Sequence, residues 1–202
     1  MKLLGGEIGG AIDKDKFLFL YQNEYGTLND NQRGGLLDLL GFIEADSDIT
    51  DIRWNAYELA TVKHECAGTW QPIAEYGKGK GRTYGEPDKK TGLVYYGRGY
   101  VQLTWADNYK TMGTFTGADL YQNPDLAMQP DIAYRIMSVG MRKGLFTGVG
   151  LSKYINVDKC DYVNARRIIN GTDCAEKIAG YATTIEGMLQ QCVNEESATA
   201  TA

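Results

Sequence analysis

Histidine is almost absent from this sequence: His64 is the only one in 202 residues. A zinc-protease helix needs a second histidine one turn later, and that position is Gly68. Closely spaced C-x-x-C pairs, which hold structural zinc, are also missing. The cysteines are scattered, at Cys66, Cys160, Cys174 and Cys192. We therefore expect no metal site and no cofactor, and we interpret the cysteines as reduced, small, buried residues.

Long apolar runs and an excess of positive charge are absent as well. No segment reaches the length of a transmembrane helix, so we expect no membrane insertion. The first residues, MKLLGGEIGGAIDKDK, lack the continuous apolar stretch of a secretory signal, which favours a protein made and kept in a cytoplasm. The net charge of −5 argues against broad nucleic-acid binding, which needs a basic surface.

The chain is long enough for one domain with a sizeable core, or for one domain divided into two lobes around a cleft. We expect a loose leader at residues 1–12, a single domain at residues 13–193 and a disordered tail at residues 194–202. The 25 glycines indicate many turns. The 14 tyrosines fit a surface that stacks on sugars or bases, but packing in the core and at its rim accounts for most of them.

Apolar periodicity predicts three helices in the first third of the chain. The first begins near Asp15 and stops at Gly26, and the second lies within residues 27–46. A third covers about residues 51–67, preceded by the hydroxyl and acidic residues of SDITD. On a helical wheel, the side of this third helix opposite the apolar stripe carries Trp54, Glu58, Thr61 and Glu65. We expect an open cleft on that side, with bulk solvent as the alternative.

Residues 68–100 are rich in Gly, Lys and Tyr, and they cannot form a long helix. They indicate a loop with a short β-hairpin, in which LVYY, residues 93–96, is the best strand candidate. Such a long loop inside a compact domain is usually functional. Its basic stretch KGKGR, residues 78–82, fits contact with anionic cell-wall peptides as well as it fits a solvated loop.

The second half of the chain again predicts helices. One follows VQLTW, and another, after an Asn-Pro turn, ends at Gly144. A further helix covers CDYVNARRIIN, residues 160–170, and the next glycine closes it. Asp173 with Glu176 predicts a capping box for the last helix, which ends near Val193.

Two glutamates have the context of a glycosidase site. Glu65 lies at the end of the third predicted helix, and Glu75 lies ten residues later in the glycine-rich loop. Glycoside hydrolysis needs one carboxylic acid to protonate the leaving oxygen and a second carboxylate to activate water or attack carbon. Apolar surroundings would keep a proton on the first group, and a wet polar loop would keep the second ionised. Spacing alone is a weak signal for such a pair.

Four blocks then appear in a recognisable order: HECAGTW, YYGRGYVQLTWADNY, NPDLAMQPDIAYRIM and RRIING. Over about residues 50–185 they resemble glycoside hydrolase family 19, the plant-type chitinases and, more closely, the phage endolysins of that family. YYGRGYVQLTW is the most specific block. The resemblance implies a mainly α, lysozyme-like α+β fold, with two helical lobes around a substrate cleft and a small β-hairpin.

The resemblance also implies roles for individual residues. Glu65 matches the general acid, Glu75 best matches the general base, and Thr104 stands where a serine helps to hold the attacking water. The positions that match sugar-binding residues are Tyr96, Gln102, Asn108 and Asn170. The family inverts the anomeric centre, which implies direct attack by water and carboxyl groups roughly 6.5 to 9.5 Å apart.

Some residues depart from the family pattern. The segment between the two glutamates is shorter than in plant chitinases, so Glu86, in TYGEPD, competes with the favoured Glu75 for the role of base. Cys66 stands where chitinases often carry threonine. The short spacing, followed by Thr83, also resembles the catalytic arrangement of phage lysozymes.

Other side chains near these blocks favour structural roles. We expect Arg98, between two glycines, to hold the loop through carboxylate or carbonyl contacts, and His64 to pack or hydrogen-bond rather than carry protons. Trp105 fits the core, and Trp70 fits either the core or a sugar platform.

Taken with the resemblance, the sequence favours a monomeric peptidoglycan glycosidase. This muramidase-type endolysin would hydrolyse β-1,4 bonds of the bacterial cell wall by acid–base catalysis. It would wait in the host cytoplasm until release to the wall, or be carried in the virion. Two alternatives stay open: a chitinase that acts on a β-1,4-GlcNAc polymer, and a non-catalytic virion or wall-binding protein on the same fold.

Overall fold

The computed structural model describes residues 11–193 of the chain. The predicted tail lies outside the described residues, and so does the predicted leader except for Ala11 and Ile12. Ile12 is buried and forms an isolated antiparallel bridge with Val193, so the two ends of the described chain meet.

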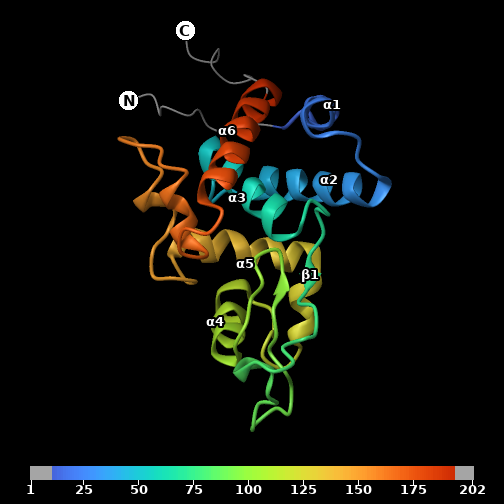
Figure 1. Cartoon of the computed structure of the whole chain (residues 1–202), viewed down its shortest axis with the longest axis vertical. Helices are drawn as coiled ribbons and strands as arrows, with labels where there is room; N and C mark the ends of the chain where they lie inside the picture. Colours follow the sequence, from blue (N-terminus) through green and yellow to red (C-terminus); the bar gives the residue numbers. More distant parts are fainter. Residues whose placement is uncertain (1–10, 194–202) are drawn as a thin grey trace.

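Residues 11–193 form six α-helices and one small antiparallel sheet (Figure 1). The α-helices are α1 (Lys14–Tyr25), α2 (Asp30–Ala45), α3 (Ile52–Glu65), α4 (Ala106–Thr116), α5 (Pro130–Lys143) and α6 (Ala175–Cys192). The sheet pairs β1 (Ile73–Ala74) with β2 (Arg98–Gly99). Short 3-10 helices are η1 (Thr83–Gly85), η2 (Pro124–Met128), η3 (Leu151–Lys153) and η4 (Asn164–Ile168). None of the helices among these residues is both long and apolar enough to cross a bilayer.

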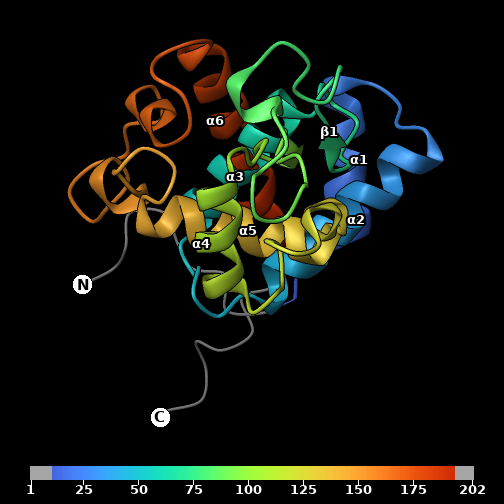
Figure 2. The ribbon, with the colours of Figure 1, turned by 90° about the horizontal axis from the view of Figure 1, so that it is seen from below.

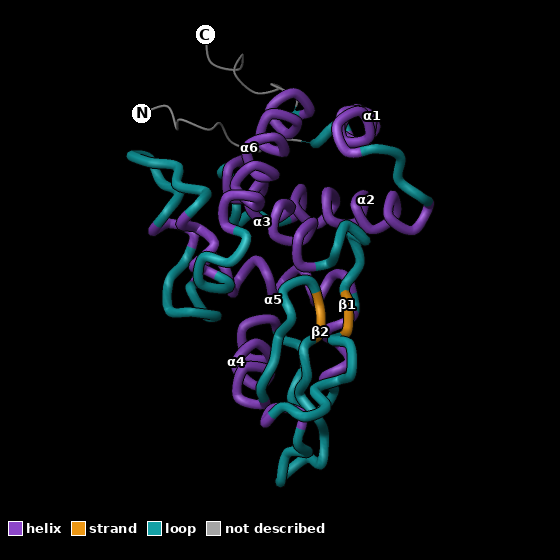
Figure 3. The backbone as a smooth tube through the Cα atoms, viewed as in Figure 1, coloured by secondary structure: helices purple, strands orange, loops and turns teal. Residues whose placement is uncertain are grey.

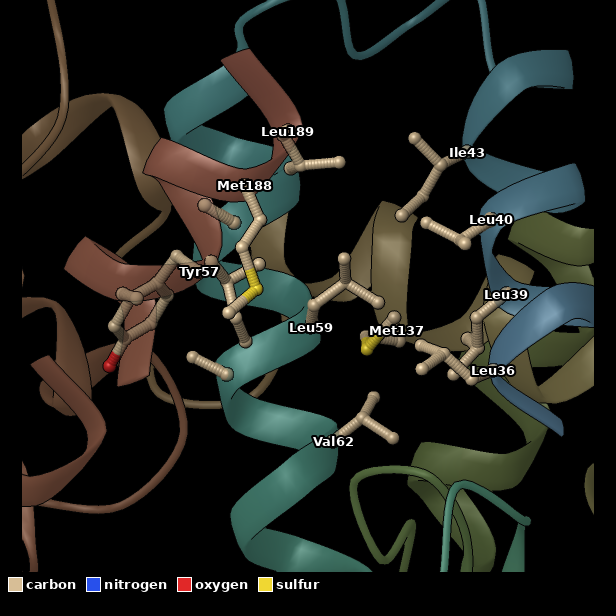
Figure 4. Packing of buried hydrophobic residues seen from close by; sticks show 14 of the residues in the cluster. Leu36, Leu39, Leu40, Ile43, Tyr57, Leu59, Val62, Met137, Met188 and Leu189 are labelled. Atoms are coloured by element: carbon tan, nitrogen blue, oxygen red, sulfur yellow. The ribbon is translucent and has the colours of Figure 1, made fainter. Parts of the chain in front are cut away.

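The apolar side chains gather in two clusters, which define two lobes. The larger cluster joins α1, α2, α3 and α6, and Figure 4 shows leucines of α2 facing α3 and α6 across it. The smaller cluster lies under α4 and the loops around the sheet, and it includes Tyr95, Tyr109 and Leu120. This arrangement confirms the predicted mainly helical, two-lobed architecture with a small two-stranded sheet.

Helix α5 lies between the two lobes and packs against both α2 and α4 (Figures 1 and 2). Its residues Met137 and Met141 belong to the larger cluster, whereas Ile132 and Ile136 belong to the smaller one. Apolar residues on two sides of one helix therefore tie the lobes together.

Several helix ends lie where the sequence predicts them, because local groups satisfy the free backbone there. Gly26 ends α1 with a positive φ of 94°, and Gly144 ends α5 in the left-handed conformation. Asn29 and Gln32 form a reciprocal capping box at the start of α2.

The expectation of an open cleft along one side of α3 is wrong for most of its length. Glu58 and Thr61, which the wheel placed on that side, are 0% and 1% exposed. α3 runs through the middle of the larger lobe, and helices cover it on more than one side. On that side, only Trp54 in the first turn and Glu65 at the end of the helix are partly exposed.

Three other local predictions are also wrong. LVYY, residues 93–96, is not a strand; the strands are the two-residue segments on either side of the long loop that contains it. That loop connects β1 to β2 (Figure 3). The register pairs Ile73 with Gly99 and Ala74 with Arg98, so the loop between the strands is closed at its base.

The predicted helix at residues 160–170 is reduced to the five residues of η4. The predicted capping box of Asp173 with Glu176 is wrong too, because α6 begins after Cys174, whose side chain makes no capping hydrogen bond. The carbonyl of Asp173 instead accepts a hydrogen bond from Arg166. A tertiary contact has replaced the local cap.

Candidate active site

Glu65 is the last residue of α3, and a buried arginine from a distant segment holds its carboxylate. Arg166 Nη1 donates to Glu65 Oε1 at 2.5 Å, and the two side chains are 2% and 20% exposed. Arg166 Nε donates to the carbonyl of Asp173 at 2.8 Å, which fixes the guanidinium plane. Within residues 11–193 no donor reaches Glu65 Oε2. One carboxylate oxygen is therefore fixed and the other is free to meet a ligand.

Arg166 lies within RRIING, one of the four blocks of the sequence, and the sequence alone assigns it no role. The structure places it on η4, where its neighbours Ala165 and Ile168 are fully buried. An arginine inside a buried stretch needs an anionic or carbonyl partner, because an unpaired buried charge is costly. The burial of this stretch is known only from the structure, so the sequence by itself did not predict Glu65 as the partner.

Glu75 directly follows β1, and both oxygens of its carboxylate are held. Tyr84 Oη donates to Oε1 at 2.6 Å, and the backbone N–H of Gly97 donates to Oε2 at 3.1 Å. The backbone of Glu75 also donates to the Gly97 carbonyl at 2.7 Å. The hydrogen bond to Glu75 raises the pKa of Tyr84, so the phenol keeps its proton and remains the donor.

Gln102 lies beside Glu75 because a tight turn brings it back to the sheet. Arg98 and Leu103 exchange backbone hydrogen bonds, and Gln102 takes a left-handed φ of 57° between them. Its Nε2 donates to the Ile73 carbonyl at 2.8 Å. A Cβ added at Gly97 would lie 2.8 Å from Gln102 Oε1 and 3.4 Å from Glu75 Cβ. The side chains of Gln102 and Glu75 therefore both lie against Gly97.

Thr104 and Asn108 lie on the segment that leads into α4. Asn108 Nδ2 donates to the Thr104 carbonyl at 2.9 Å, which ties the two predicted site residues together. Trp105, between them, has a strained φ of 74° and is 48% exposed, so the expectation that it belongs to the core is wrong. Its ring meets Tyr84 edge to face, with 5.5 Å between centroids.

Three other candidates lie in different surroundings. Tyr96 lines a pocket of about 430 Å³ together with Arg98 and Asp125, and its ring stacks on the Arg98 guanidinium at 3.5 Å. Asn170 is exposed, and its backbone N–H donates to the carbonyl of Arg166. Glu86 is exposed at the end of η1, and its carboxylate has no hydrogen-bond partner among the described residues.

The structural roles expected for nearby residues are partly borne out. Arg98 is 4% exposed, pairs with Asp125 at 2.9 Å and donates to the carbonyls of two loop residues, as predicted. Trp70 is fully buried and belongs to the core rather than to a sugar platform. His64 is half-buried.

The four cysteines are free, in agreement with the sequence, but only two of them are buried. Cys160 and Cys174 are exposed, which corrects the expectation of four buried thiols. Burial raises the pKa of Cys66, the residue after Glu65, to about 12. The Cys66 thiol therefore stays protonated at neutral pH and is a poor nucleophile.

The fold thus holds two carboxylates separately, Glu65 at the end of α3 and Glu75 directly after β1. Side chains able to hold a metal ion do not gather in groups of three or more anywhere in residues 11–193. One carboxylate with a free oxygen and a second carboxylate held by two donors are suited to moving protons.

Comparison with known proteins shows similarity to one family over about half of the chain. The family model described as chitinase class I matches residues 41–138. Chitinase 3 of Oryza sativa subsp. japonica is 38% identical over 84 residues, which cover 34% of this chain and 26% of that protein. Chitinase 12 of the same organism is 36% identical over 103 residues, covering 43% of this chain and 32% of its own length. The match therefore spans about a quarter to a third of these relatives.

Solved structures extend the similarity over most of the chain. Chitinase C from Streptomyces griseus HUT6037 superposes with a TM-score of 0.63 and 25% identity, covering 92% of this chain and 79% of that one. A bacterial family 19 chitinase superposes with a TM-score of 0.62, covering 89% of this chain and 95% of its own. Its 23% identity supports the fold alone.

Proposed function

We propose that the chain hydrolyses β-1,4 glycosidic bonds in a polymer that contains N-acetylglucosamine, because residues 41–138 match the chitinase class I family model and the fold is that of family 19 chitinases. The observation that carries the proposal is the pair of carboxylates, each fixed by its own hydrogen-bond partners. Acid–base hydrolysis of a glycoside needs two such groups and no metal ion.

Glu65 is the general acid in this proposal. Arg166 holds Oε1 and leaves Oε2 to carry the proton that passes to the leaving oxygen. The buried guanidinium also fixes the carboxyl in one orientation, so little freedom is lost when the substrate binds. Arg166 thus positions the acid without itself transferring a proton.

Glu75 is the general base, and it removes a proton from the water that attacks the anomeric carbon. Two donors hold its carboxylate, whereas the competing candidate Glu86 is exposed and unpartnered among residues 11–193. Thr104 would help to hold the water. Gln102 and Asn108, together with Tyr96 and Asn170, would contact the sugars, and attack by water would invert the anomeric centre.

The polymer that we propose is bacterial peptidoglycan. The alternative is chitin, the polymer after which the similar rice and Streptomyces proteins are named. The two polymers share the β-1,4 linkage and differ in the lactyl and peptide groups that peptidoglycan carries. Purified sacculi and chitin hexamer, digested side by side, separate them by which one releases new reducing ends.

The catalytic proposal is tested with Glu65→Gln and Glu75→Gln. Each substitution should lower kcat more than about 10²-fold, since general acid or base catalysis contributes at least that much. Glu86→Gln and Glu176→Gln, which change exposed glutamates, should retain parental activity. Circular dichroism and the melting temperature should match the parent in all four proteins.

Stereochemistry gives an independent check. Proton NMR during the first minutes of digestion should show the α-anomer at the new reducing end, because the bond cleaved is β. A β-anomer would contradict the inverting mechanism. Undiminished activity of Glu65→Gln on both polymers would remove the assigned acid.

A further inference from the structure

A group of unpaired cations stands in the loop that carries Glu75. Lys78, Lys80 and Arg82 are all exposed, and none of them forms an ion pair with any described residue. We call residues 77–82 the cationic loop. The whole chain has a net charge of −5. Three cations at alternate positions without acidic partners therefore make this loop locally positive on a protein that is negative in total.

The backbone of the cationic loop is folded into successive turns. Lys78 N–H donates to the Glu75 carbonyl, Lys80 N–H to Gly77 and Arg82 N–H to Gly79, at 2.9 to 3.1 Å. Glycines 77, 79 and 81 have φ values of 77° to 82°, which these tight turns require. The three cations are therefore presented on a defined backbone and not on a freely moving chain.

Both ends of the cationic loop lie close to the proposed base, Glu75. It starts two residues after Glu75, and the Tyr84 hydroxyl, two residues beyond Arg82, returns to the Glu75 carboxylate at 2.6 Å. A close approach of Gly79 to Gly85 locks this closure, since a Cβ at Gly85 would lie 1.8 Å from the Gly79 oxygen. A polymer bound at Glu75 would thus have the cations of this loop beside it.

We propose that the cationic loop binds carboxylates of the peptide stems attached to the glycan, and so selects peptidoglycan over chitin. This inference rests on the proposed glycosidase function. Chitin is uncharged and gives three exposed cations no partner. A glycan that carries carboxylate-rich peptides matches them in charge, and such complementarity mainly raises the rate of encounter and the specificity.

The test is the triple variant Lys78→Gln, Lys80→Gln, Arg82→Gln. On sacculi with intact peptides at low salt, kcat/KM should fall at least about tenfold, because electrostatic attraction to a charged polymer is lost. On chitin hexamer, which carries no charge, kcat/KM should stay within about twofold of the parent. Added NaCl should erase the difference on sacculi, since salt screens exposed charges.

A matched control removes the same charges elsewhere: Arg33→Gln, Lys110→Gln, Lys143→Gln, all exposed on α2, α4 and α5. It should cleave sacculi like the parent. Co-sedimentation with sacculi, in a Glu65→Gln background, gives a readout that needs no turnover, and the triple variant should bind more weakly there.

The outcomes distinguish a failure of the proposed function from a failure of the loop inference. A parent enzyme that releases reducing ends from neither polymer contradicts the proposed function itself. An active parent whose triple variant keeps full activity on sacculi contradicts only the loop inference. An equal loss on sacculi and on chitin hexamer also contradicts it, because the loop would then act through general positioning.

Discussion

Tyr84 is a single residue on which the geometry of the proposed base depends. Its hydroxyl contacts Glu75 Oε1, and its ring packs edge to face on Trp105, so the phenol has little freedom. The sequence had not singled it out. The hydrogen bond between Tyr84 and Glu75, nine residues apart, depends on how the loop folds back. No periodic pattern in the sequence predicts this contact.

Tyr84→Phe should lower kcat by roughly ten- to a hundredfold, with KM nearly unchanged, because a hydrogen bond to a charged group is worth about 1.5 to 3 kcal/mol and the ring packing is kept. Steady-state kinetics at neutral pH measure kcat and KM separately. A rise in KM with an unchanged kcat would mean that Tyr84 acts on substrate binding and not on the proposed base.

At the same scale, the ion pair between Glu65 and Arg166 marks a limit of sequence reasoning. The His-Glu motif identifies Glu65 through its resemblance to a family, and local chemistry identifies the polar residues around it. The two partners are 101 residues apart, and the arginine becomes visible only when η4 packs against the end of α3. The sequence proposes the catalytic candidates, which stay a prediction, whereas the groups that hold them are found only in the structure.

At the scale of the element, α3 carries a buried carboxyl group that has no place in the proposed mechanism. Glu58 is fully buried, and neither of its oxygens has a hydrogen-bond partner among the described residues. Burial raises its pKa well above 4.5; the charge of Asp46 raises it further, and Arg142 opposes the rise. Asp46 is itself held by hydroxyls of Tyr134 and Ser138.

This raised pKa makes the stability of the fold depend on pH. Above pH 4.5 the unfolded chain releases the Glu58 proton, whereas the folded protein retains it up to a higher pH. The contribution of Glu58 to the free energy of unfolding is thus largest at low pH, and it falls as the pH rises toward the folded pKa. The slope is about 1.4 kcal/mol per pH unit for one proton.

Glu58→Gln should remove this dependence, because the amide has no proton to lose. Urea unfolding at pH 5, 6, 7 and 8 should show the variant gaining on the parent as the pH rises. Glu176→Gln, at an exposed position on α6, should follow the parent throughout. A difference between Glu58→Gln and the parent that stays constant with pH would show that Glu58 does not hold a proton in the folded state.

The elements themselves were predictable to the extent that their signals are local. Gly26 and Gly144 stop helices through a backbone conformation that glycine adopts readily, so these ends follow from the sequence. The two-residue strands and the short η4 carry no such signal, because contacts with distant segments determine them. The wheel for α3 failed at Glu58 for the same reason: a central helix is covered on several sides, and its polar stripe is buried with it.

At the scale of the whole molecule, α5 makes the two lobes depend on each other. Ile136 packs in the smaller cluster, and Met137, the next residue, packs in the larger one. Loss of α5 would expose apolar surface of both clusters at once. The lobes should therefore unfold as one cooperative unit, although each has its own group of buried side chains.

Ile136→Ala tests this coupling, because it removes apolar volume from the smaller cluster only. It should lower the free energy of unfolding by about 2 to 5 kcal/mol. Hydrogen exchange, followed by mass spectrometry, should accelerate by the same factor in the slowest amides of α4 and of α6, which lie in different lobes. Phe115→Ala, at a 47% exposed position on α4, should change neither. Faster exchange confined to α4 would mean that the smaller lobe opens alone and that α5 does not couple the two clusters.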